Sequence, residues 1–159
     1  AQPERQQQFT MHPTALIPHA GNAILLDEIR ETAQTDRLFA CLTVRPGTAF
    51  SETDESLPGW VGIEIFAQVI AALSTLRDGR PDGRARIGLL LGVREYRCTP
   101  DRFPVGMRLD AEVVEAMSDG LSLGVFDGTL KSGGVVVAEG IVSAYRLADP
   151  EAFLRGDRS

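Results

Sequence analysis

The feature that most constrains the fold of this chain is the stretch of residues 57–76, LPGWVGIEIFAQVIAALSTL. It opens with Pro-Gly, which suits the entry to a helix, and then stays apolar on nearly every side for about four turns. A helix without a polar face must be surrounded by the rest of the chain. Glu64 and Gln68 interrupt this pattern, and because they lie four residues apart they share one helix face. A carboxylate in such surroundings is costly unless it is paired, protonated or used in chemistry, so Glu64 is the first indication of a function.

Segments with the pattern of strands flank this helix on both sides. Before it, a segment broken at Pro18 leads into a strand expected from about Ile24. The other expected strands cover residues 37–44, 86–98, 108–116, 121–130 and 135–147, with hairpin turns at 119–120 and 133–134. An antiparallel sheet that must cover an apolar helix curls around it, so the predicted class is α+β, with a curved antiparallel sheet wrapped around one long buried helix. Residues 1–14 are expected to be a mobile tail, and residues 15–159 a single domain.

Composition narrows the class of function. The formal net charge of −6 argues against nucleic acid as the main partner. The chain has two cysteines, no CxxC and no His/Cys cluster at zinc spacing, so we expect no disulfide framework, no metal and a reducing cytoplasm. The polar residues inside the apolar stretch argue against a membrane span, and the polar start of the chain lacks the apolar core of a signal peptide.

Three segments, taken in order, resemble one known family. The segment IPHAGNAILLDEI resembles LPHRxPFLLVDRV, PGWVGIEIFAQVIAAL resembles PGVLxxExxAQ, and LLLGVREYRCTPDRFPVGMRL resembles the strand, loop and strand that follow. These motifs belong to the FabA/FabZ-type 3-hydroxyacyl-[acyl carrier protein] dehydratases. The details resemble most the ApeP-like subgroup of aryl polyene dehydratases. The resemblance implies a hot-dog fold, no cofactor, and dehydration of carrier-bound 3-hydroxyacyl thioesters to trans-2-enoyl thioesters.

One departure from the family pattern concerns the catalytic histidine. FabZ-type enzymes carry it in a GHFPGxP loop before the helix, whereas the matching loop here, AFSETDESLPG, has none. The chain contains only His12, in the expected tail, and His19, in the Pro-His pair that the closest subgroup retains. We therefore expect His19 to be the base that takes the α-proton, because a neutral imidazole has a pKa near working pH.

The other roles in such an elimination fall on the helix. A carboxyl group in an apolar pocket stays protonated, so Glu64 suits the acid that protonates the departing hydroxyl. The backbone N–H groups near Gly59 and Trp60 suit the binding of an enolate-like oxygen, and Gln68 suits an orienting hydrogen bonder. Structural explanations stay open at this point: Glu64 as an acid satisfied by Gln68, and His19 as the cap of a turn.

Partners and rival functions follow from the same features. Open sheet edges and the resemblance both favour a homodimer, or a heterodimer with a paralogous hot-dog subunit. Seven arginines form either a solvated rim or a docking patch for the acyl carrier protein and its phosphopantetheine: Arg77, Arg80, Arg84, Arg86, Arg94, Arg97 and Arg102. The rival functions are a hot-dog acyl thioesterase and, because the loop histidine is missing, a catalytically silent subunit that pairs with an active dehydratase.

Overall fold

The computed structural model describes residues 9–79, 88–147 and 150–156. Before the central helix lie β1 (Thr10–Met11), η1 (Pro13–Ala15), η2 (Gly21–Ala23), β2 (Glu28–Arg30), β3 (Arg37–Thr43) and β4 (Leu57–Pro58). The helix α1 (Val61–Arg77) is followed by β5 (Gly88–Cys98), β6 (Arg102–Phe103), β7 (Arg108–Ser118), β8 (Leu123–Ser132), β9 (Val135–Arg146) and α2 (Pro150–Arg155).

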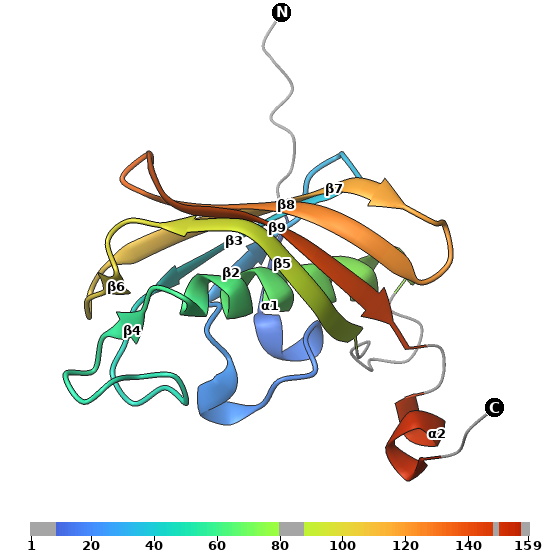
Figure 1. Ribbon diagram of the computed structural model, residues 1–159, viewed down its shortest axis with the longest axis horizontal. Coiled ribbons are helices and arrows are strands. Elements are labelled where there is room, and N and C mark those ends of the chain that lie inside the picture. The colour runs from blue at the N-terminus through green and yellow to red at the C-terminus, as the bar shows by residue number, and fades with distance from the viewer. Residues whose placement is uncertain (1–8, 80–87, 148–149, 157–159) are drawn as a thin grey trace, which may run out of the picture.

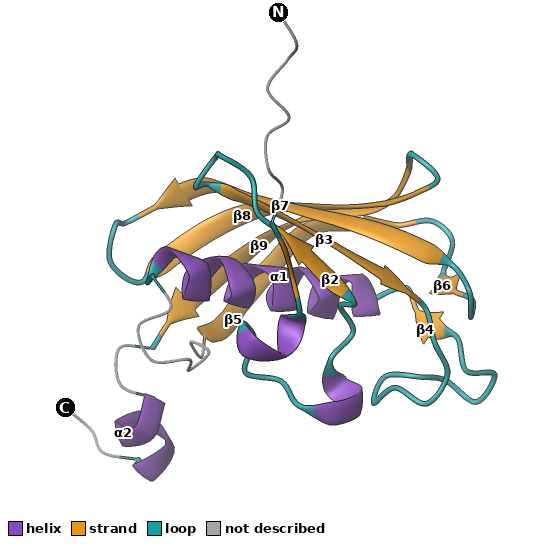
Figure 2. Cartoon of the chain, turned by 180° about the vertical axis from the view of Figure 1, so that it is seen from behind, coloured by secondary structure: helices purple, strands orange, loops and turns teal. Residues whose placement is uncertain are grey.

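The main sheet curves over α1, as Figures 1 and 2 show from opposite sides. Its order is β1-β2-β3-β7-β8-β9-β5, and each pairing between described strands is antiparallel. The strands β4 and β6 form a separate pair beside the start of α1. The predicted α+β class, a curved antiparallel sheet around one long helix, is confirmed, and β5 closes the sheet as an edge strand.

Two aromatic side chains pack against glycines and hold α1 close to the sheet. The Phe66 ring lies over Gly128 of β8, where an added Cβ would come within 2.7 Å of the ring carbons. Tyr96 of β5 fills the space that side chains would occupy at Gly62 and at Gly140. A larger residue at Gly128 would therefore push the helix outward, because protein interiors leave no spare room.

The segment before the helix differs from the expected tail and strand. Residues 1–8 lie outside the described part of the chain, but β1 pairs with β2 through Met11 and Ile29, and Pro13 is buried. The strand expected from Ile24 begins only at Glu28. Residues 24–26, which precede it, are buried but belong to no strand. Side chains of other segments hydrogen-bond to their backbone instead: the Leu25 N–H donates to Gln68 Oε1 at 3.0 Å.

The predicted hairpin at residues 119–120 is longer than expected. Strand β8 starts at Leu123 rather than Leu121, because Asp119 Oδ1 accepts the N–H groups of residues 121, 122 and 123. A carboxylate that accepts several N–H groups stabilises a turn in place of strand pairing. These hydrogen bonds also lower the pKa of the Asp119 carboxyl group. The widened hairpin lines one end of the cavity described next.

Candidate active site

The structure brings His19 and Glu64 into direct contact within one chain. His19 Nε2 lies 2.7 Å from Glu64 Oε1. Glu64 stands in the first turn of α1, and His19 lies in the bend between η1 and η2. The two side chains are 24% and 25% exposed, so the carboxyl group is less buried than the sequence predicts and faces a cavity instead. The pair can share or exchange a proton without an intermediary.

Gln68 fixes the position of this pair. Its buried amide donates from Nε2 to the carbonyl oxygen of Ala23 at 2.7 Å and to Glu64 Oε1 at 3.1 Å, while its Oε1 accepts the Leu25 N–H. Because the Leu25 N–H must meet an oxygen, the orientation of the amide is unambiguous. One side chain thus ties the segment that follows His19 to the face of the helix that carries Glu64.

Gly59 and Trp60 lie at the start of α1, away from this contact. The Gly59 N–H donates to the carbonyl oxygen of Asp101 at 2.6 Å, and the Gly59 carbonyl accepts the Tyr96 hydroxyl at 2.5 Å. Trp60 is 57% exposed and meets Phe50 edge-on, with the ring centroids 6.5 Å apart. The described lining of the cavity contains neither Gly59 nor Trp60. The Gly59 amide already has a partner, so it is not open to a ligand in this conformation.

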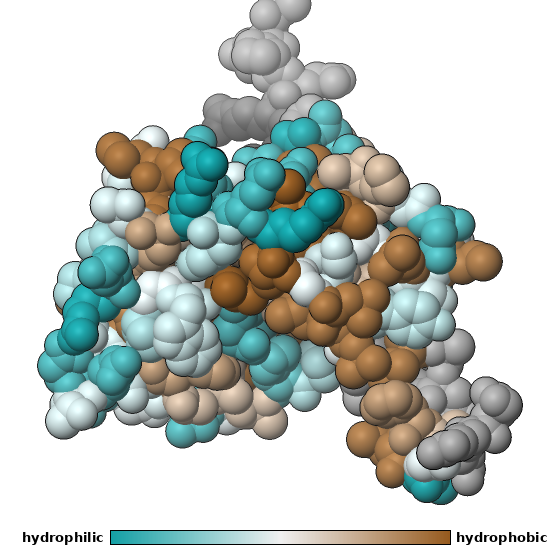
Figure 3. Space-filling view, in the orientation of Figure 1, coloured by the Kyte–Doolittle hydropathy of each residue, from teal (hydrophilic) through white to brown (hydrophobic). Residues whose placement is uncertain are grey.

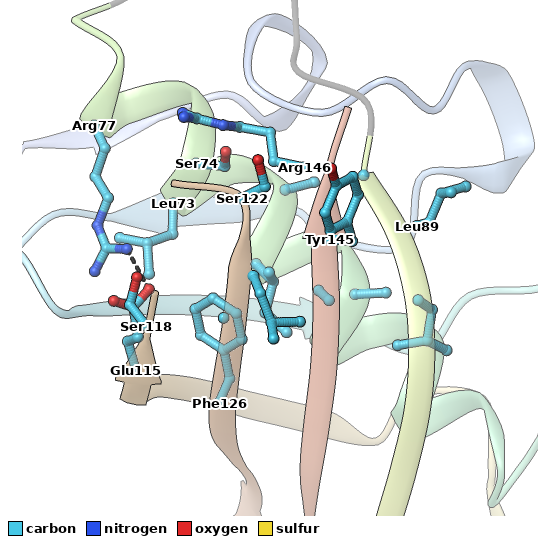
Figure 4. Close-up of a pocket in the computed structure, with 18 of the residues that line it drawn as sticks. Leu73, Ser74, Arg77, Leu89, Glu115, Ser118, Ser122, Phe126, Tyr145 and Arg146 are labelled. Carbon is cyan, nitrogen blue, oxygen red and sulfur yellow. Dashed lines mark hydrogen bonds and ion pairs between the residues drawn. The ribbon is translucent and has the colours of Figure 1, made fainter. Parts of the chain in front are cut away.

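A cavity of about 370 Å³ begins at His19 and Glu64 and follows one face of α1. Small side chains on that face leave the space: Ala67, Ala71 and Ser74. The opposite wall comes from β5, β8, β9 and the hairpin between β7 and β8, and Figure 4 shows part of it. A volume of this size is typical of small-molecule sites.

The end of the cavity away from His19 is polar, a feature that the sequence analysis did not predict. Arg77 Nη1 lies 2.5 Å from Glu115 Oε2 (Figure 4). Arg146 Nη1 lies 2.6 Å from Asp78 Oδ1. These pairs depend on the register of β7 and β9, which periodicity does not set. The small residues three, seven and ten positions after Glu64, which are Ala67, Ala71 and Ser74, were a signal that could have revealed the cavity wall.

The Tyr96 hydroxyl and the Cys98 thiol, near the start of α1, have a structural role. Burial raises the pKa of the Tyr96 hydroxyl and that of the Cys98 thiol, so both groups stay protonated near neutral pH and act as donors. Cys98 Sγ donates to the carbonyl oxygen of Pro100 at 3.0 Å. Together with the Tyr96–Gly59 hydrogen bond, this contact holds the loop after β5 against the helix.

The remaining residues singled out from the sequence lie elsewhere. His12 interacts with Thr14 through Nδ1, at 2.8 Å from Oγ1, and caps η1. Within the expected arginine patch, Arg102 pairs with Asp54 on the surface, whereas Arg80, Arg84 and Arg86 lie outside the described residues. Within the described ranges, no group of three or more His, Cys, Asp or Glu side chains could hold a metal ion. No helix in those ranges has the length and apolarity needed to cross a membrane.

One protein family accounts for nearly the whole chain. The family model of the ApeP-like dehydratases (ApeP dehydratase) matches residues 11–155. The chain belongs to the ApeP-like family. No curated protein sequence matches it significantly. The family match confirms the resemblance drawn from the three sequence motifs.

Solved structures agree with this assignment and with the hot-dog fold. A chain of the dehydratase heterocomplex ApeI:P from Xenorhabdus doucetiae is 26% identical, with a TM-score of 0.80 over 93% of this chain and 99% of that one. A mutant of the phenylacetic acid degradation protein PaaI from Thermus thermophilus is 18% identical, with a TM-score of 0.53 over 75% of this chain and 91% of that one. A mutant thioesterase PA1618 from Pseudomonas aeruginosa is 16% identical, with a TM-score of 0.53 over 75% of this chain and 81% of that one. The last two share the fold alone.

Proposed function

We propose that this ApeP-like chain is one half of a dehydratase that removes water from 3-hydroxyacyl thioesters on an acyl carrier protein and leaves trans-2-enoyl thioesters. The observation that carries the proposal is the 2.7 Å contact between His19 and Glu64 at one end of a cavity with an apolar middle. Elimination of water needs a base and an acid within reach of neighbouring carbons, and this pair supplies one of each.

In the proposed reaction His19 takes the α-proton and Glu64 donates a proton to the departing hydroxyl. The C–H and C–O bonds break, a C=C bond forms, and one water leaves. Afterwards His19 carries the extra proton and Glu64 is a carboxylate. Because the two side chains are in contact, the proton can return directly from the imidazolium to the carboxylate, which restores the starting state. Gln68 has a positioning role, because its amide donates to the same Glu64 oxygen, Oε1, that the imidazole contacts.

The amides at the start of α1 are the proposed donors to the thioester oxygen, with Trp60 as the main one because the Gly59 N–H pairs with Asp101. Since neither residue lines the cavity of its own chain, these amides would act on a substrate that lies between two subunits.

The partner we propose is a second hot-dog subunit. The similar ApeP-like structure comes from a heterocomplex of two dehydratase chains. The edge strand β5 of this chain presents Leu90 and Leu91 at 47% and 57% exposure, and Figure 3 shows a band of apolar surface on this side of the molecule. An open, apolar edge strand is suited to pairing with a strand of another chain.

The carrier protein is proposed to dock beside the start of α1. Arg94 and Arg97 are exposed on β5, and Arg102 is exposed on β6, which pairs with the strand that leads into the helix. Charge complementarity between basic and acidic surfaces speeds such encounters. This placement would deliver the phosphopantetheine arm to the helix amides.

A silent structural role is the second candidate function. It is favoured by the loop of residues 46–56, which contains no histidine although FabZ-type enzymes carry their base there. In that case the partner would supply the chemistry, and this chain would shape the shared tunnel.

One experiment separates these functions. The full chain, alone and together with a hot-dog partner from the same organism, is incubated with a 3-hydroxyacyl carrier protein, and the carrier is followed by intact mass. We expect loss of one water, abolished by His19→Ala in this chain. Release of the acyl group as free acid would indicate a thioesterase. Water loss that depends on the partner but survives His19→Ala and Glu64→Gln would indicate the silent role.

A further inference from the structure

The cavity changes its chemistry along its length. Near the middle its wall is apolar and includes Ile70, Leu73 and Phe126. Beyond Leu73 it becomes polar, because Arg77, Glu115 and two serines of the β7–β8 hairpin line it there (Figure 4). The transition falls at the last turn of α1, and it is built from residues of three separate elements.

The polar end is held firmly. Arg77 forms an ion pair with Glu115, with 2.5 Å between Nη1 and Oε2. It also donates a hydrogen bond from Nε to the carbonyl oxygen of Thr35 at 2.9 Å. The Glu115 side chain is only 16% exposed. On the neighbouring side, Arg146 pairs with Asp78 and donates to the carbonyl oxygen of Leu121 at 3.1 Å. Such a network resists displacement, because breaking one partner away leaves a partly buried charge without compensation.

The apolar part of the cavity therefore has a defined length. Arg77 lies thirteen positions after Glu64 on α1, and at 1.5 Å per residue the wall between them spans about 20 Å. A methylene group gains affinity when it leaves water for an apolar wall, and it gains little against ion pairs and hydroxyls that would have to lose their own hydration.

We propose that the Arg77–Glu115 ion pair sets the acyl chain length that this protein accepts. A saturated chain that extends from the His19–Glu64 end gains affinity with each carbon until its terminus reaches this pair. Longer chains gain nothing more. The inference rests on the proposed function, because it takes an acyl chain as the occupant of the cavity, but it concerns binding and does not require turnover.

The test uses a series of saturated acyl chains, from butanoyl to hexadecanoyl, joined to pantetheine by an amide that can be neither dehydrated nor hydrolysed. Binding to the full-length protein is measured by isothermal titration calorimetry. In the wild type we expect the affinity to rise by about fourfold per methylene over the shorter chains and then to level off within the series.

Two variants should move that plateau in opposite directions. Arg77→Leu combined with Glu115→Leu replaces the ion pair by apolar side chains, and the affinity should continue to rise for chains beyond the wild-type plateau. Ala71→Leu fills the middle of the cavity, and the plateau should come at a shorter chain. The matched control is Arg37→Leu with Glu112→Leu, which removes a second Arg–Glu pair of 3.2 Å on the outer face of the sheet and should leave the plateau in place.

A plateau at the wild-type chain length in the Arg77→Leu, Glu115→Leu variant would overturn the inference, and so would the absence of any binding by wild type. Each variant is checked by circular dichroism. If the double leucine variant misfolds, Arg77→Met with Glu115→Met, which removes the same ion pair with side chains closer in length, takes its place, and Ala71→Leu tests separately that the acyl chain occupies this cavity. The proposed function fails independently, if the carrier-bound substrate loses no water while the length dependence of binding is still observed.

Discussion

The hydroxyl of Tyr96 lies 2.5 Å from the carbonyl oxygen of Gly59, so a side chain of the sheet fixes the residue that leads into the central helix. Removing this hydroxyl leaves the Gly59 carbonyl without its partner in a place where Gly59 is buried. We predict that Tyr96→Phe lowers the free energy of unfolding by roughly 1–3 kcal/mol, measured by urea denaturation. Tyr145→Phe, at the more exposed of the two tyrosines, is the control, and an equal effect of both changes would contradict the prediction.

Gln68 is fully buried and serves three polar groups, so an apolar residue of similar length should be costly there. We predict that Gln68→Met destabilises the fold by roughly 1–3 kcal/mol for each backbone group left unpaired at Ala23 and Leu25. The same change at the exposed Gln34 is the control. Unchanged urea midpoints for Gln68→Met would show that water replaces the amide.

Glu64→Gln keeps the size of the side chain but removes its acidic proton. If Glu64 protonates the leaving hydroxyl, water loss from the carrier-bound substrate should slow by on the order of a hundredfold to ten-thousandfold. The stability of the fold should hold, because Gln68 Nε2 can still donate to the amide oxygen. A rate within a factor of a few of wild type would remove Glu64 from the mechanism.

His19→Ala should abolish dehydration to a similar degree if the imidazole is the base. The chain provides its own control, because His12 is the only other histidine and interacts with Thr14 outside the site. We expect His12→Ala to leave the rate within about twofold, since general base catalysis depends on contact with the reacting proton. Equal rates for both variants would exclude His19 as the base.

Asp119 provides a prediction on pH. Its pKa is lowered from 3.8 by the hydrogen bonds it accepts from the hairpin backbone, so the ionised form favours the folded state. This stabilisation is present above the unfolded pKa of 3.8 and is lost as the pH falls through the lower folded value. Wild type should therefore exceed Asp119→Ala in stability near neutral pH, and the difference should shrink below pH 3.8. The measurement is urea denaturation of both proteins at a series of acidic pH values. A difference in unfolding free energy that stays constant across that series would contradict the assignment.

The sequence predicted the features that depend on local pattern. The all-apolar helix, the alternating strands and the shared face of Glu64 and Gln68 follow from periodicity, and the structure contains all three. The sequence did not predict that the backbone near Leu25 would bond to Gln68 instead of a neighbouring strand, because that choice depends on a contact across 43 residues. The Arg77–Glu115 and Tyr96–Gly59 contacts were missed for the same reason. They depend on strand register and on a bulge in β5, which no short sequence window encodes.

The contact of Phe66 with Gly128 limits which substitutions the chain can tolerate at Gly128. Phe66 and Glu64 stand two residues apart and so point to nearly opposite sides of the helix. A Cβ added at Gly128 would come within 2.7 Å of the Phe66 ring, so the ring, or the helix that also carries Glu64, would have to shift. A misplacement of about 1 Å can cost a catalytic site roughly 10²-fold in rate. A residue with no side chain, across the helix from Glu64, can therefore be a sensitive position for the proposed chemistry.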